Sequence, residues 1–167
     1  MTVRFVAAVT ALLLGVSTAA FSQEAPEAFA EHLIHQLTCK HAPDPTATLL
    51  YLNKSKRINL DRGEGADSET CWAIRPQLEV KGATFTHICA SAEDRLLLDL
   101  FPRLYWRGPG TSAGTGLRLV SGEDTATIKD WIKRTITADE TKLEVGEPTF
   151  VDGRTEISCN SLSFPYQ

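Results

Sequence analysis

The fold of this chain is decided by the stretch CWAIRPQLEVKGATFTHICA, residues 71–90. Two apolar runs meet at Lys81-Gly82, a dipeptide typical of a tight turn, which predicts a hairpin that joins residues 71–80 to residues 83–90. Pro76 lacks a backbone N–H, so we expect the first strand to lie at an edge or to contain a bulge. Alternation places three side chains of the second strand on one face, namely Phe85, His87 and Cys89.

Helices are predicted on both sides of this hairpin, because apolar residues recur there at helical spacing. The segment 26–39 has a proline in its first turn, and Asp44 stands before a proline as the N-cap of a second helix over residues 45–54. The clearest helical pattern covers residues 124–136, where Trp131 is expected in the core.

A second hairpin is predicted at the C-terminus, where Asp152-Gly153 separates the runs 143–151 and 154–162. A two-residue turn fixes the register, so Gly146 would face an inward-pointing Cys159. The N-terminal helices, this C-terminal hairpin and the packed helix near residues 124–136 together indicate an α+β fold with a mainly antiparallel sheet.

Residues 1–22 are typical of a secretory signal peptide, with a weakly basic start, an apolar stretch and small residues before an expected cleavage site at Gln23. The apolar stretch is shorter than the roughly 20 residues that a membrane-spanning helix needs. We therefore expect a periplasmic or secreted, soluble product with no membrane span. Residues 23–167 are of ordinary domain size and are expected to form a single disulfide-stabilised α+β domain.

The charge of the chain argues against a nucleic-acid partner. The sequence has 17 basic and 21 acidic residues, a net charge of −4. Removal of the signal peptide would also remove Arg4 and make the balance more negative. Nucleic acids and anionic membranes attract basic surfaces, so neither is an expected partner.

The four cysteines, Cys39, Cys71, Cys89 and Cys159, predict disulfides, because an even number in an oxidising compartment is usually paired. Their spacing matches neither a zinc site nor a CxxC redox motif, so no metal and no cofactor are expected. Four cysteines allow three pairings. We expect Cys39–Cys71, which would join a helix end to the next strand, and Cys89–Cys159, which would join two core-facing strand positions.

No catalytic residues stand out in the sequence. His32 and His35 come nearest to a metal site, but the acidic residue of a catalytic zinc helix is absent between them, and a capping or solvated role is favoured. The chain contains no nucleophile elbow and no phosphate-binding loop. A binding protein is therefore a better expectation than an enzyme.

A basic and aromatic surface is the candidate binding site. If residues 103–107 and 116–120 pair as a wide hairpin, alternation places four side chains on its outer face, namely Arg103, Tyr105, Arg107 and Arg118. Arginine and tyrosine are enriched in binding hot spots, although an ordinary solvated sheet face would look the same.

These observations favour an exported, non-enzymatic recognition module that binds a protein or an acidic polysaccharide. An inhibitor, an immunity-type protein and an envelope accessory protein all fit this description. The alternatives are a small exported hydrolase and a structural or assembly subunit of an envelope or secreted complex.

Overall fold

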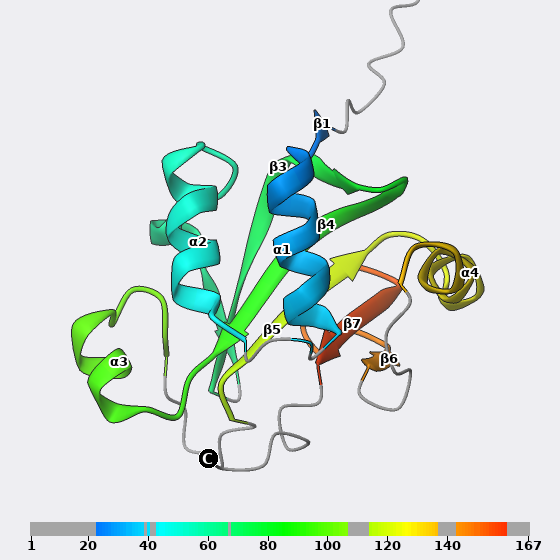
Figure 1. Cartoon of the computed structure of the whole chain (residues 1–167). Coiled ribbons are helices and arrows are strands. Elements are labelled where there is room, and N and C mark those ends of the chain that lie inside the picture. The colour runs from blue at the N-terminus through cyan, green and yellow to red at the C-terminus, as the bar shows by residue number, and fades with distance from the viewer. Residues whose placement is uncertain are drawn as a thin grey trace, which may run out of the picture.

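The computed structural model describes residues 23–38, 40, 43–66, 68–106, 114–136 and 143–159, which form one sheet with helices packed against it (Figure 1). This arrangement confirms the predicted α+β fold. The segment predicted to be a signal peptide lies outside the described residues. In chain order the elements are β1 (Gln23–Glu24), α1 (Glu27–Leu37), α2 (Pro45–Lys54), the 3-10 helix η1 (Leu60–Arg62), β2 (Glu64–Ala66), β3 (Glu69–Val80), β4 (Ala83–Ser91), α3 (Arg95–Leu100), β5 (Gly116–Ser121), α4 (Thr125–Thr135), β6 (Leu143–Gly146) and β7 (Thr155–Cys159).

The described strands follow the order β1-β3-β4-β5-β7-β6, and β2 pairs with the start of β3. The pairing of β1 with β3 is parallel and the other pairs are antiparallel. The central hairpin turns at Lys81 and Gly82 as predicted, and both residues have positive φ angles of 47° and 86°. Such angles suit the right-handed twist of the strands that the turn connects. Among the described residues, no helix has the length and the apolar character needed to cross a membrane.

A bulge in β3 changes the register of the central hairpin. Near the turn Leu78 faces Phe85, whereas further along Ala73 faces His87, so the pairing shifts between these two positions. Pro76 lies in the shifted stretch, which confirms the bulge that the missing N–H predicted. The shift matters for the rest of the structure, because it decides which side chains of the two strands lie opposite each other.

The main core lies between the sheet and the helices. Figure 1 shows α1 and α2 across one face of the sheet, and Gln36 of α1 donates a hydrogen bond of 2.9 Å to Thr48 of α2. Phe85 packs edge-on against Trp131 of α4, with 5.7 Å between ring centroids. The large side chains of this core are fully buried, namely Leu33, Leu37, Leu49, Leu52, Trp72, Ile74, Leu78, Phe85, Ile88, Leu104, Leu117 and Trp131.

The opposite face of the sheet carries a smaller apolar cluster. Cys71, Cys89 and Val120 are buried there, and Phe150 and Val151 pack against them. The prediction that Phe85, His87 and Cys89 share one face is therefore wrong, because Phe85 belongs to the main core. The physical reason is a second register shift, between Phe85 and His87 in the pairing of β4 with β5.

The C-terminal hairpin is present, but its predicted register is wrong. Cys159 faces Leu143 and not Gly146. The chain between β6 and β7 is longer than a two-residue turn, because Phe150 packs on the smaller cluster. Gly153 lies so close to Val120 that a Cβ atom there would overlap the valine side chain. Burial of this connection against the sheet therefore outweighs the local turn preference of Asp152-Gly153.

Both predicted disulfide pairings are wrong. Cys71 and Cys89 lie directly opposite each other in β3 and β4 and form a disulfide. Cys159 is also disulfide-bonded, and Cys39 lies outside the described residues. The register shift in β3 explains the difference, because it brings Cys71 opposite Cys89.

Candidate functional site

The predicted arginine and tyrosine surface depended on a hairpin that the described residues do not form. Both sides of β5 are already occupied, by β4 and by β7, so no hairpin joins it to residues 103–106. Tyr105 is only 4% exposed, and its hydroxyl makes a hydrogen bond of 2.6 Å with Thr46. Burial raises the pKa of Tyr105. Arg107 lies outside the described residues.

The two remaining arginines of that prediction lie in different surroundings. Arg103 is exposed and forms an ion pair with Asp61. Arg118 lies between two carboxylates on the sheet, Glu69 and Glu156. The structure therefore does not bring the described members of the predicted site together.

A different basic site lies beside the sheet, in a cleft of about 470 Å³ between the end of α2 and the edge of β3. Four basic side chains line this cleft, and Glu64 is the one acid among its described lining residues. Two asparagines complete the polar lining of the cleft. Ile58 and Ala73 add small apolar surfaces to it. The basic residues are Lys56, Arg57, Arg62 and Arg75.

The backbone at the end of α2 positions these cations. Arg57 donates its N–H to Leu52 at 2.8 Å, and its carbonyl accepts the N–H of Arg75 at 2.8 Å, which ties the turn to β3. Lys56 has a φ angle of 58°, in the left-handed region that favours glycine. A non-glycine residue there costs about 1–2 kcal/mol. The chain thus places a cation at a position where glycine would be more stable.

The cleft contains positive charge that nearby carboxylates do not neutralise. Lys56, Arg62 and Arg75 are exposed. Within the described part of the chain, none of these three side chains has a carboxylate oxygen within 4.0 Å. Arg57 also lines the cleft, but it is only 8% exposed. Concave positive sites of this kind concentrate anions from solution.

A second hollow of about 510 Å³ adjoins the cleft and shares Ala73 and Arg75 with it. His87 and Asp152 line this second hollow. Burial lowers the pKa of His87, so its imidazole is predominantly neutral at neutral pH and adds little positive charge. The excess of basic side chains therefore lies in the first cleft, and Arg75 lines both hollows.

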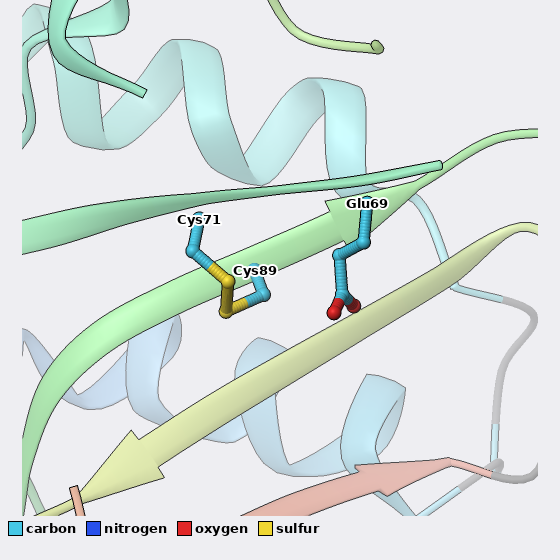
Figure 2. Close-up of side chains that lie close together, drawn as sticks. All are labelled: Glu69, Cys71 and Cys89. Atoms are coloured by element: carbon cyan, nitrogen blue, oxygen red, sulfur yellow. A yellow bond between two sulfur atoms is a disulfide. The ribbon is translucent and has the colours of Figure 1, made fainter. Parts of the chain in front are cut away.

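A buried cluster of charged residues lies on the sheet face that carries the disulfide. Figure 2 shows Glu69 projecting from the same face as Cys71 and Cys89, with helices behind the strands. Arg118 Nε lies 3.0 Å from Glu69 Oε1, and Arg118 Nη1 donates a hydrogen bond of 3.0 Å to Glu156. The Arg118 side chain is 26% exposed, whereas the two carboxylates are more deeply buried.

Glu69 is the unusual member of this cluster. Its Oε1 is buried and accepts no hydrogen bond from any described residue, because the nearby Arg118 N–H does not point at it. Burial raises the pKa of Glu69 to about 7, against the lowering effect of Arg118 and with a further rise from Glu156. A carboxyl group with such a pKa exchanges its proton near neutral pH.

The donor atoms of Glu69, Cys71 and Cys89 lie within 4.8 Å of one another, a spacing that would suit a metal ion. Both sulfur atoms are bonded to each other, however, and a metal ligand must be a thiolate. Arg118 beside the carboxylate also opposes a cation. The disulfide-bonded protein therefore has no metal centre at this position.

The basic cleft could be found only in part from the sequence. The run Lys54-Ser55-Lys56-Arg57 at the end of a helix is the sequence signal that indicates part of the cleft. Arg75 lies on a strand and joins these residues only through the tertiary structure. Comparison of the chain with protein-family models, with curated proteins and with solved structures finds no match.

Proposed function

We propose that the protein is an exported, non-enzymatic recognition module that binds an acidic region of another macromolecule in the basic cleft. The observation that carries this proposal is the gathering of four basic side chains around one cleft in a chain of net charge −4. An inhibitor, an immunity-type protein and an envelope accessory protein all work by such recognition.

The conformation of the cleft adds support. Lys56 keeps a left-handed backbone conformation, which favours glycine, and such local strain is concentrated at functional sites. Arg62 and Arg75 are exposed, and their guanidinium groups suit bidentate contacts with oxyanions. Binding would neutralise positive charges that no described carboxylate contacts.

A small exported hydrolase is the second candidate, and Glu69 is the observation that favours it. A carboxyl group with a pKa of about 7 could act as a general acid or base. Glu69 is only 6% exposed, however, and it is not among the described residues that line the basic cleft. Burial leaves little of its carboxylate accessible to a substrate, so recognition is the better-supported function.

The proposal can be tested by cross-linking the mature protein in its native cells. A photoreactive residue at Asn59, which lines the cleft, is expected to capture a macromolecular partner. The variant Arg62→Glu/Arg75→Glu is expected to lose this product. A matched control, Lys129→Glu/Lys133→Glu, changes the charge equally on exposed positions of α4 and is expected to keep it.

Both double variants should fold, because exposed substitutions usually change stability by about 0.5 kcal/mol or less. Thermal unfolding of each purified variant checks this expectation. Equal capture by the cleft variant and the control, with both proteins folded, would show that the cleft is not the binding surface.

A further inference from the structure

We propose that the cleft binds a carboxylate-rich peptide segment of a partner protein. This inference rests on the proposed function and names the chemistry of the ligand. It follows from three properties of the lining: the geometry of its donors, the position of its one acid and the character of its walls.

The donors suit several carboxylates. Arg62 and Arg75 are exposed, and each carries a planar guanidinium whose N–H groups match the two oxygens of a carboxylate. Together with Lys56 they give three exposed basic residues against one acid among the described lining residues, an excess of two positive charges. One carboxylate would leave half of this excess uncompensated, so a ligand with at least two acidic groups fits better.

Glu64 distinguishes a peptide from a phosphate or sulfate ligand. Its carboxylate lies among the cations and can only accept hydrogen bonds when ionised. The oxygens of an ionised phosphate or sulfate ester are also acceptors, so Glu64 would repel them, as it would repel the carboxylates of a peptide. A peptide segment carries backbone N–H groups beside its acidic side chains, and these N–H groups can donate to Glu64.

The walls of the cleft favour a peptide over a nucleic acid or a polysaccharide. The described lining includes no aromatic side chain, and its apolar members are Ile58 and Ala73. Proteins that bind single-stranded nucleic acids stack bases on aromatic rings, and sugar rings pack on aromatic faces in a similar way. A segment of acidic residues needs neither contact, because hydrogen bonds and charge are sufficient to hold it.

The experiment compares three probes with the mature protein at about 0.1 M ionic strength, where the Debye length is about 10 Å. A fluorescent oligoglutamate peptide is titrated by anisotropy, and a sulfated oligosaccharide and inorganic phosphate serve as competitors. An oligoglutamine peptide of equal length is the neutral control. We expect the oligoglutamate to bind more tightly than either competitor, and the oligoglutamine not to bind.

Variants of the cleft and of α4 test whether the oligoglutamate binds in the cleft. Arg62→Glu/Arg75→Glu is expected to weaken oligoglutamate binding at least about tenfold, since it reverses two charges of the cleft. Lys129→Glu/Lys133→Glu is expected to leave it within about twofold, because neither lysine lines the cleft and exposed charges are partly screened by salt. Glu64→Gln is expected to strengthen the binding of phosphate and sulfate more than that of oligoglutamate, since only the peptide loses a charged acceptor for its N–H groups.

Each contrary outcome has a distinct meaning. Tighter binding of the sulfated oligosaccharide, lost in the cleft variant, would overturn the peptide inference and leave the proposed function standing. An equal loss of oligoglutamate binding in the cleft variant and the α4 control would overturn the inference as nonspecific charge attraction. Failure of every probe to bind would also overturn it, and the cross-linking experiment would then decide the proposed function separately.

Discussion

Replacement of Glu69 by glutamine is expected to remove a pH-dependent loss of stability. Burial raises the pKa of this carboxyl from 4.5 to about 7 in the folded protein. The folded state then holds the proton more tightly than the unfolded chain does between these two values. Stability therefore falls as the pH rises from 4.5 through 7, and this loss is complete above the folded pKa.

The size of the effect follows from the shift. A difference of one pKa unit corresponds to 1.36 kcal/mol, so the rise from 4.5 to about 7 corresponds to about 3 kcal/mol. The glutamine variant resembles the protonated carboxyl and has no proton to lose. Relative to the wild type, the free energy of unfolding of Glu69→Gln is expected to increase by about 3 kcal/mol between acidic and mildly alkaline pH.

Urea unfolding of both proteins at a series of pH values measures this difference. Other titrating groups are present in both proteins, so the difference between the two curves isolates Glu69. Glu156→Gln provides a second comparison, because removal of its negative charge is expected to lower the pKa of Glu69 and move the loss to lower pH. A difference between wild type and Glu69→Gln that stays constant with pH would refute the reasoning.

Three further predictions concern the cysteines and the N-terminus. Replacing both Cys71 and Cys89 with alanine is expected to lower the free energy of unfolding by about 3 kcal/mol, because the bridge closes a loop between residues 18 apart; an unchanged urea midpoint under oxidising conditions would contradict this. Cys159 is disulfide-bonded as well, so peptide mapping without reduction is expected to recover it joined to Cys39, the remaining cysteine. A free thiol at Cys39 would contradict this pairing. Sequencing of the protein from envelope or medium is expected to begin at Gln23, and an uncleaved N-terminus would exclude the predicted export signal.

Local patterns predicted the elements well, because each depends on residues close together in the chain. The predicted helix over residues 45–54 coincides with α2, whose N-cap Asp44 accepts a hydrogen bond from Ala47. Helix α4 lies within the predicted segment and buries Trp131 as expected. The Lys81-Gly82 turn also lies where its residue types placed it.

Register was harder to predict than the elements. The sequence indicated a bulge near Pro76, but nothing in it specified how far the pairing of the two strands would shift. The disulfide pattern depends on that shift, because only the shifted register places Cys71 opposite Cys89. The C-terminal register failed for a related reason, since packing of Phe150 against the sheet outweighed the preference of the turn.

The segment 62–70 gives a further example. Its glycines and acids are typical of a loop, yet it contains β2 and the beginning of β3. Gly63 and Gly65 are required by packing, because a Cβ atom at Gly63 would overlap Trp72 and one at Gly65 would crowd Trp106. Here glycine permits close approach to aromatic rings, a role that composition alone does not distinguish from flexibility.

The net charge of the chain does not describe the charge of its binding surface. A total of −4 describes the average of the chain, whereas attraction of an anion depends on the potential where it binds. The turn after α2 places Lys56 and Arg57 beside Arg75, and the backbone bond from Arg75 to Arg57 fixes their proximity. Acidic residues elsewhere repel a polyanion that approaches at random. This contrast of local attraction and general repulsion favours partners whose acidic groups are confined to one short segment over uniformly charged polymers.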